Sequence, residues 1–192
     1  MPLSDSEIIE QIRKGAKHQF ARLVDRYKEK AMTLAVRMLK NREDAEEATQ
    51  DAFIRAYNAL DKFEGTAKFS TWFYRIIYNV CLTKLGQRKE QFESIDYNEE
   101  TTYGAAESWS NVFEHTEFEM KDLLTFVKNA IEKLPIKYET ILSLFYLQDL
   151  SYQEICEVTQ LPLGTVKVHL FRARALLHER LGKEFQQENI VV

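Results

Sequence analysis

The sequence predicts an all-α protein of two small helical domains joined by an acidic flexible linker. Apolar residues recur at i, i+3 and i+4, which is the spacing of a helix, and no strand-like alternation competes with it. Six glycines and three prolines in 192 residues leave few sites for tight turns. Residues 90–120 hold nine acidic residues and no lysine or arginine. We therefore place domains at 1–89 and 121–192, with the linker at 90–120.

The first domain is predicted to contain four helices. Ser4 and Glu7 have the spacing of a capping box that opens the first. The second covers 17–39, and Asn41 caps the third. The fourth covers 70–89.

Four helices are also predicted in the second domain. The first follows an apolar stripe over 120–134, and the second covers 137–147. Ser151 and Glu154 form another capping box that opens a short third helix. A tight turn precedes a long last helix from about Gly164, so the sequence predicts a helix-turn-helix.

The charge balance is misleading when it is taken over the whole chain. With 26 basic and 30 acidic residues the net charge is −4, which argues against a nucleic-acid partner. Residues 1–89 alone hold 17 basic and 12 acidic residues, so the first domain is basic. The acidic linker is either a plain spacer or a strip that competes with nucleic acid for the basic faces.

Bases and aromatic rings are mixed over residues 65–89, where no acidic residue occurs. This mixture suits single-stranded nucleic acid, because cations follow the phosphates while exposed rings stack on unpaired bases. The alternative is that the rings belong to the core, and we expect about half of them to be buried. The rings are Phe69, Trp72, Phe73, Tyr74 and Tyr78.

Two further charged faces allow alternative interpretations. On the last helix, Lys167, His169 and Arg172 are placed to reach phosphates or base edges in a major groove, unless they form an ordinary solvated face. Val166 and Leu170 of the same helix are assigned to packing. Acidic residues gather over 43–51, either to dock a basic protein surface or as a solvated helix face.

No grouping typical of an enzyme is present. The four histidines are scattered, and no phosphate-binding glycine loop, nucleophile elbow or metal motif occurs, so we expect no cofactor and no metal. Cys81 and Cys156 lie far apart inside apolar helical patterns, which disfavours a disulfide. No signal peptide or membrane-spanning run is visible, so an intracellular, cytoplasmic protein without membrane insertion is expected.

The motifs resemble the extracytoplasmic-function sigma factors of bacterial RNA polymerase, in the sigma-70 family. Region 2 of that family resembles DAEEATQDAF at 44–53 and FSTWFYRI at 69–76, followed by Asn79. Region 4 resembles LP at 134–135, SYQEI at 151–155 and PLGTVK at 162–167. The resemblance spans nearly the whole chain outside the linker.

The resemblance implies a role for three sets of residues. The helix at 44–53 would bind the clamp coiled coil of the β-prime subunit through Asp44, Glu47, Gln50 and Asp51. A pocket formed by the loop at 64–68 and Asn79 would hold a flipped base of the minus-ten promoter element. The minus-ten set is Phe63, Glu64, Gly65, Lys68, Phe69, Ser70, Trp72, Arg75, Asn79, Lys84, Arg88 and Lys89. The minus-thirty-five set is Thr165, Lys167, Val168, His169, Phe171, Arg172 and Arg174.

The function implied by the resemblance is that of a non-enzymatic sigma factor. It would bind core RNA polymerase through the β and β-prime subunits, recognise promoter DNA, assist melting and be held inactive by an anti-sigma factor. Val168 and His169 depart from the common family pattern, which leaves the promoter sequence open. Cys156 also departs from that pattern, and we expect it to be a packed small apolar residue. Two alternatives remain: a stand-alone helix-turn-helix regulator that never contacts core polymerase, and an interaction-only helical bundle.

Overall fold

The computed structural model describes residues 3–87 and 127–188, and all regular secondary structure within these ranges is helical. None of the helices in the described ranges is long and apolar enough to cross a membrane. We refer to residues 3–87 as the N-terminal half and to residues 127–188 as the C-terminal half. The elements of the N-terminal half are α1 (Asp5–Arg13), η1 (Lys17–Gln19), α2 (Phe20–Leu39), α3 (Arg42–Ala59), η2 (Leu60–Lys62) and α4 (Phe69–Gln87).

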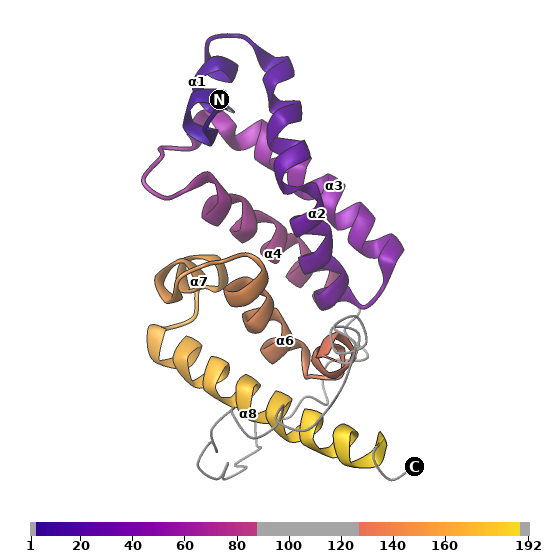
Figure 1. Cartoon of the computed structure of the whole chain (residues 1–192). Coiled ribbons are helices and arrows are strands. Elements are labelled where there is room, and N and C mark those ends of the chain that lie inside the picture. The colour runs from indigo at the N-terminus through magenta and orange to yellow at the C-terminus, as the bar shows by residue number, and fades with distance from the viewer. Residues whose placement is uncertain (1–2, 88–126, 189–192) are drawn as a thin grey trace.

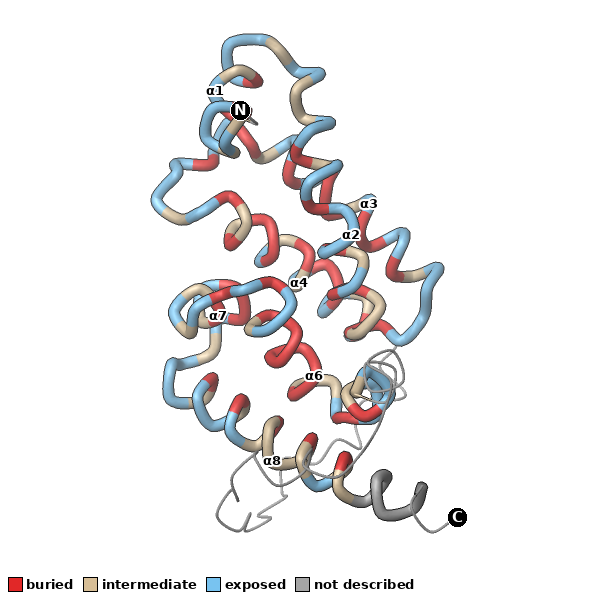
Figure 2. Tube along the Cα trace, viewed as in Figure 1, coloured by how far each residue is buried: buried red, intermediate tan, exposed pale blue. Residues whose placement is uncertain are grey.

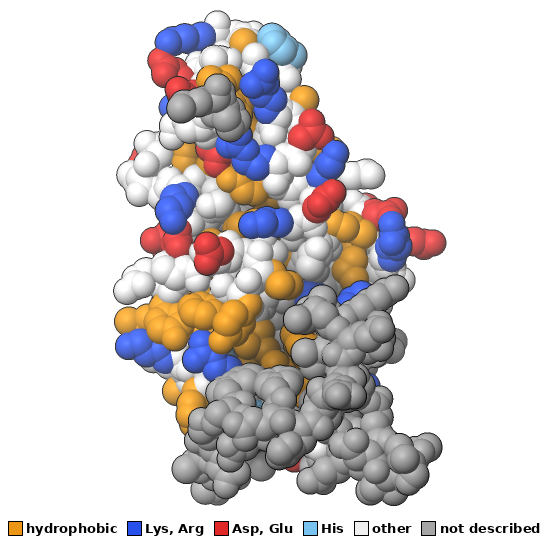
Figure 3. All heavy atoms as spheres, in the orientation of Figure 1, with side chains coloured by type: hydrophobic (Ala, Val, Ile, Leu, Met, Phe, Trp, Pro, Cys, Tyr) orange, Lys and Arg blue, Asp and Glu red, His pale blue; other side chains and the backbone are white. Residues whose placement is uncertain are grey.

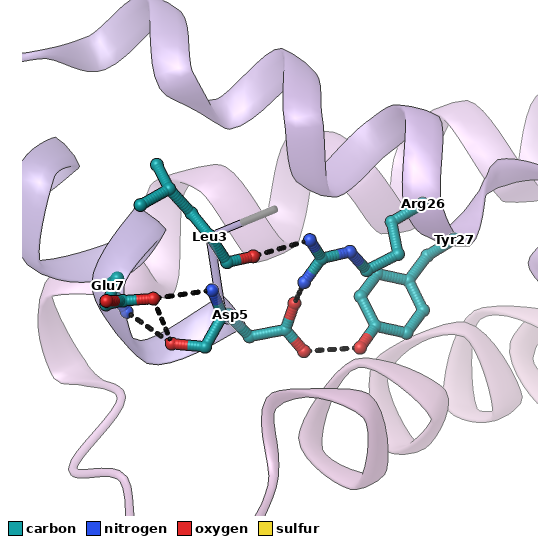
Figure 4. A network of polar contacts seen from close by, with 6 residues as sticks. Leu3, Asp5, Glu7, Arg26 and Tyr27 are labelled. Carbon is teal, nitrogen blue, oxygen red and sulfur yellow. Dashed lines mark hydrogen bonds and ion pairs between the residues drawn. The ribbon is translucent and has the colours of Figure 1, made fainter. Parts of the chain in front are cut away.

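The predicted capping box opens α1. The Glu7 amide donates to the Ser4 hydroxyl over 3.3 Å, and the Glu7 carboxylate accepts from the Ser4 amide over 2.7 Å. Asp5 then ties α1 to α2, since it pairs with Arg26 and accepts a hydrogen bond from the Tyr27 hydroxyl (Figure 4). The start of α1 is thus held by α2.

The predicted second and third helices are confirmed with one difference in detail. The segment predicted as one helix from residue 17 begins with the 3-10 turn η1, and the α-helix starts at Phe20. Lys40 ends α2 with φ at 52°, in the left-handed region. The Asn41 side chain then accepts from the Asp44 amide over 3.0 Å, so it caps α3 as expected.

The C-terminal half is built around the predicted helix-turn-helix. Its elements are α6 (Ile136–Leu142), η4 (Ser143–Leu147), α7 (Tyr152–Thr159) and α8 (Leu163–Glu188), and residues 127–132 are helical as well. The segment predicted as one helix at 137–147 changes to a π-helix at Ser143, and the Gln148 amide bonds to the Ser143 carbonyl over 3.0 Å. Gln160, with φ at 60°, makes the turn between α7 and α8.

The two halves lie against each other. Figure 1 shows α7 beside α4 and α6 near the end of α2, and these helix pairs are in contact. Buried residues line the inner sides of the helices in both halves (Figure 2). Phe73 and Ile77 of α4 and Ile155 of α7 are among the fully buried residues. The predicted linker at 90–120 lies outside the described residues, so the domain boundaries stay a prediction.

Candidate functional site

A pocket of about 300 Å³ opens where the loop after η2 meets the first turns of α4. Gly65 in this loop has φ at 75°, a conformation that favours glycine. The Arg13 guanidinium, from α1, donates to the main-chain carbonyls of Leu60 and Phe63 and thereby fixes the start of the loop. The pocket is lined by Lys62, Phe63, Glu64, Thr66, Ala67, Thr71, Trp72, Arg75 and Glu157.

The aromatic rings of α4 divide between the core and the pocket. Phe69, Phe73 and Tyr74 are buried, whereas Trp72 and Tyr78 are half-buried, which confirms the expectation that about half would be core. Trp72 forms part of the pocket wall, and its ring lies 5.0 Å from that of Phe63. Of these five rings, Trp72 is therefore the one that lines the pocket.

Two rings of the predicted minus-ten set are buried, and their assignment to DNA stays a prediction. Phe69 is 3% exposed and Phe63 is 8% exposed. Phe69 packs against Tyr27, Phe63 and Phe73, with ring centroids 5.4 to 6.0 Å apart. Periodicity did not separate Phe69 from Trp72, because both lie in the first turn of α4, and Phe63 precedes that helix.

The polar members of the minus-ten set lie at or near the pocket. Glu64 and Arg75 line it, and both are exposed. Lys68 is exposed, and Ser70 is half-buried at the start of α4. Asn79 is exposed further along α4 and does not line the described pocket, in contrast to the implied base pocket. Arg88 and Lys89 lie outside the described residues.

Lys84 has a partner that the sequence did not predict. Its Nζ lies 2.8 Å from the Glu47 carboxylate, and its side chain is only 19% exposed. Lys84, which the resemblance assigns to DNA, is therefore paired with Glu47 of α3, which the resemblance assigns to polymerase.

The acidic face of α3, over residues 43–51, is largely exposed to solvent. Glu47 is 72% exposed and Gln50 is exposed. Asp44 is half-buried, and Asp51 pairs with Arg55 one turn away over 2.9 Å. Figure 3 shows acidic and basic side chains interspersed over the N-terminal half, and hydrophobic side chains gathered below them on the C-terminal half.

The helix-turn-helix exposes some of the residues expected to reach DNA at the start of α8. Val166 and Leu170 are buried, as predicted for packing positions, whereas Lys167, Val168 and Phe171 are exposed. Thr165 and Arg172, also in the minus-thirty-five set, are half-buried. The exposed residues form a mixed basic and apolar face.

Two members of the minus-thirty-five set are turned toward the protein. Arg174 lies over the rings of Phe145 and Tyr146, at 5.4 and 5.6 Å from their centroids. His169 packs edge-on against Tyr138, and burial together with the charges of Lys137 and Arg172 lowers its pKa below 6.5. Burial and these neighbouring charges therefore favour the neutral form of the His169 ring.

The two cysteines are unremarkable thiols in this structure. Burial raises the pKa of the Cys81 thiol to about 12, so it stays protonated at neutral pH. Cys156 is half-buried and packs against the core, as expected for a small apolar residue.

Sequence reasoning missed the residues that the C-terminal half brings to the pocket. Glu157 lines the pocket from α7, and Glu154 contacts both Lys68 and Thr71. The sequence pattern at Glu154 indicated only a helix cap. Its contact with Thr71 joins residues more than 80 positions apart. Nothing in the local pattern indicates such a pairing.

Known protein families match both halves of the chain. Residues 23–91 match Sigma-70 region 2, and residues 127–177 match Sigma-70, region 4. The ECF RNA polymerase sigma factor SigW of Bacillus subtilis is 36% identical over 176 residues, which cover 90% of this chain and 94% of that protein.

Two solved structures share the fold. The structure of CnrH in complex with the cytosolic domain of CnrY has a TM-score of 0.63 at 22% identity, covering 92% of this chain and 96% of that one. The sigma factor RpoE of Bartonella quintana, solved with the anti-sigma factor NepR, has a TM-score of 0.62 at 19% identity, covering 84% and 96%.

Proposed function

Because the chain belongs to the extracytoplasmic-function sigma factors of the sigma-70 family, we propose that it recognises promoters through two separate DNA-binding surfaces and helps to open them. The N-terminal half binds the minus-ten element as single strand at the pocket beside α4. The C-terminal half binds the minus-thirty-five element as duplex through the start of α8. The activity is that of a transcription initiation factor without an enzymatic reaction of its own.

The observation that carries this proposal is the pocket beside Trp72. One wall offers a half-buried indole ring, and Arg75 supplies a positive charge at the pocket. Extruding a base from a duplex costs a few kcal/mol. Stacking on an aromatic ring contributes about 1–3 kcal/mol per base, and charge-assisted hydrogen bonds add to it. The pocket therefore combines the chemistry needed to trap a flipped base during melting.

Duplex recognition is assigned to the first two turns of α8. Lys167 is exposed and suited to phosphate or base-edge contact, while Val168 and Phe171 present apolar surface. Apolar side chains in a major groove contact the thymine methyl group. The promoter sequence read by this chain therefore depends on these exposed residues rather than on His169 or Arg174.

The exposed acidic face of α3 is assigned to core polymerase. Glu47 and Gln50 are open to a partner, and an acidic face repels DNA, so a basic protein surface is the complementary partner. We place the β-prime subunit there, with the β subunit as a further contact of the holoenzyme. The chain then acts where the polymerase is, in the cytoplasm.

An anti-sigma factor is the proposed regulator. The fold is shared with an RpoE solved in complex with the anti-sigma factor NepR. Overproducing the chain above the level of such a partner should raise transcription from its promoters, and mapping the new transcript starts would identify the regulon.

The direct test is transcription with purified core polymerase and genomic templates. The proposal predicts initiation at a restricted set of sites that share two sequence elements, and only when the chain is present. A chain that binds duplex DNA but adds no promoter-specific product would instead be a stand-alone helix-turn-helix regulator.

A further inference from the structure

Lys84 lies on the opposite side of α4 from the side chains at the candidate minus-ten site. Trp72, Arg75 and Asn79 are three or four residues apart, so they share one side of the helix. Lys84 follows Arg75 by about two and a half turns, at about 3.6 residues per turn, which places its side chain on the far side. A strand bound along Arg75 and Asn79 is therefore out of line with Lys84.

The far side of α4 packs against protein. Val80, Cys81 and Leu85, all within one turn of Lys84, are buried. Helices α3 and α4 are in contact, and Lys84 Nζ lies 2.8 Å from Oε2 of Glu47 on α3. The Lys84 side chain is 19% exposed, whereas that of Glu47 is 72% exposed. The lysine is thus mostly covered, and the glutamate stays open to a partner.

Glu47 lies in the middle of the residues assigned to polymerase. Asp44, Gln50 and Asp51 are three or four residues from it, so the four side chains share one face of α3. Asp51 pairs with Arg55 of the same helix over 2.9 Å, whereas the ion pair of Glu47 comes from another helix. The Glu47 carboxylate is therefore held from α4.

Such an ion pair prepares an exposed side chain for binding. Ordering one long, exposed side chain at an interface lowers affinity by a factor of about two to ten. Lys84, with its side chain mostly covered, restricts the Glu47 carboxylate before a partner arrives. A carboxylate has two oxygens and accepts from several donors, so Lys84 can stay in place when a basic surface binds Glu47.

We propose that Lys84 is a positioning residue of the polymerase-docking face. From α4 it holds the Glu47 carboxylate in the orientation that core polymerase binds, and it does not contact the minus-ten strand. This inference rests on the function proposed for α3. It assigns the two sides of α4 to different tasks, with Arg75 on the side that binds DNA and Lys84 on the side that supports the polymerase contact.

The test follows association and dissociation of the full chain and purified core polymerase by surface plasmon resonance. Lys84→Met keeps the apolar part of the side chain and removes the ammonium group. We expect dissociation about two- to tenfold faster than in the wild type, because Glu47 is no longer held. Association should not slow, because the face becomes more negative and still attracts a basic surface. Lys84→Arg keeps the charge and should dissociate like the wild type.

A double variant shows whether Lys84 acts through Glu47. In that case, adding Lys84→Met to Glu47→Gln gives no further acceleration of dissociation. A purely structural role would instead add the same acceleration in both backgrounds, which would overturn the inference. Lys14→Met is the matched control, since it removes an ammonium group from the exposed ion pair with Glu10, and it should leave dissociation unchanged.

A second measurement tests the separation of Lys84 from DNA. Binding of a fluorescein-labelled single-stranded DNA to the full chain is followed by anisotropy at several salt concentrations. Lys84→Met should keep the wild-type affinity and the wild-type slope of log affinity against log salt. Arg75→Met should weaken binding and reduce the slope by about 0.7, as expected for one phosphate contact on a single strand. A reduced slope in Lys84→Met would place the lysine at DNA and overturn the inference.

The outcomes distinguish this inference from the function on which it rests. Faster dissociation in Glu47→Gln together with unchanged dissociation in Lys84→Met overturns the positioning role and leaves the polymerase face of α3 intact. Unchanged dissociation in Glu47→Gln overturns the function proposed for Glu47, and the inference falls with it.

Discussion

Lys84 of α4 and Glu47 of α3 form an ion pair in which Lys84 Nζ lies 2.8 Å from the carboxylate. Family resemblance assigns the lysine to DNA and the glutamate to polymerase, yet in the free chain each neutralises the other. A change at either residue therefore acts on helix packing as well as on a partner.

A charge swap separates these two effects. Glu47→Lys places two ammonium groups together, so it should lower stability by about 0.5–1 kcal/mol and weaken core binding at least about tenfold. Adding Lys84→Glu restores the ion pair and the melting temperature but not the affinity for core, because the outer face stays basic. Thermal melting and core binding measured by anisotropy would check this, with Glu10→Lys on α1 as control. Recovery of core binding in the double variant would remove α3 from the polymerase interface.

Trp72 should matter more for promoter opening than for core binding. Trp72→Ala removes the ring that lines the pocket, so base trapping should weaken by about 1–3 kcal/mol while core affinity stays near that of the wild type. Permanganate reactivity of unpaired thymines would report the opening. Phe73→Ala is the matched core variant, since Phe73 is fully buried and its loss should destabilise the fold by about 3–5 kcal/mol. Equal loss of both activities in Trp72→Ala would indicate that its ring is structural.

Arg13 should control the order of the pocket loop. Arg13→Met removes the donors to the Leu60 and Phe63 carbonyls, so it should destabilise the observed conformation of the pocket loop by about 1 kcal/mol. We expect faster amide hydrogen exchange over residues 61–68 and several-fold weaker binding of single-stranded DNA. Lys14→Met, which removes an exposed pair with Glu10, provides the control. Unchanged exchange over this loop would show that Arg13 does not hold it.

Lys167 and Arg174 should respond differently although both belong to the same predicted set. Lys167→Ala should weaken duplex binding across sequences and reduce the slope of log affinity against log salt by about 1. Arg174 lies over two rings, so Arg174→Ala should lower the melting temperature of the C-terminal half and leave the salt slope unchanged. A reduced slope in Arg174→Ala would place that side chain at DNA.

The interface between the halves should weaken in acid through Glu154. Burial raises the pKa of Glu154, but hydrogen bonds from Ser151 and the ammonium of Lys68 outweigh it and hold the pKa at about 2, below the ordinary 4.5. Because the folded-state pKa is lowered, the charge stabilises the structure above pH 4.5, and this stabilisation is lost as the pH falls toward 2. The difference in melting temperature between the wild type and Glu154→Gln should be constant above pH 5 and vanish toward pH 2, as calorimetry would show. A difference that persists to the lowest pH would contradict this.

The helical architecture and most helix ends were predictable from the sequence because they depend on neighbours within one or two turns. Ser4 with Glu7, Asn41, and Ser151 with Glu154 each cap a helix at the predicted place, since capping hydrogen bonds join residues three apart. The helix-turn-helix and its buried Val166 and Leu170 followed from the same short-range periodicity.

The role of individual side chains at the candidate site depended on contacts distant in sequence. Trp72 and Phe69 look alike in the sequence. Only the packing of the N-terminal helices on one another buries Phe69 and leaves Trp72 at the pocket. Glu154 is a cap by its sequence and a partner of Lys68 by its position in space. Local hydrogen bonding and periodicity determine which segments are helices, whereas the docking of one helix on another determines which charges meet, because the attraction between charges depends on distance in space and not on distance along the chain.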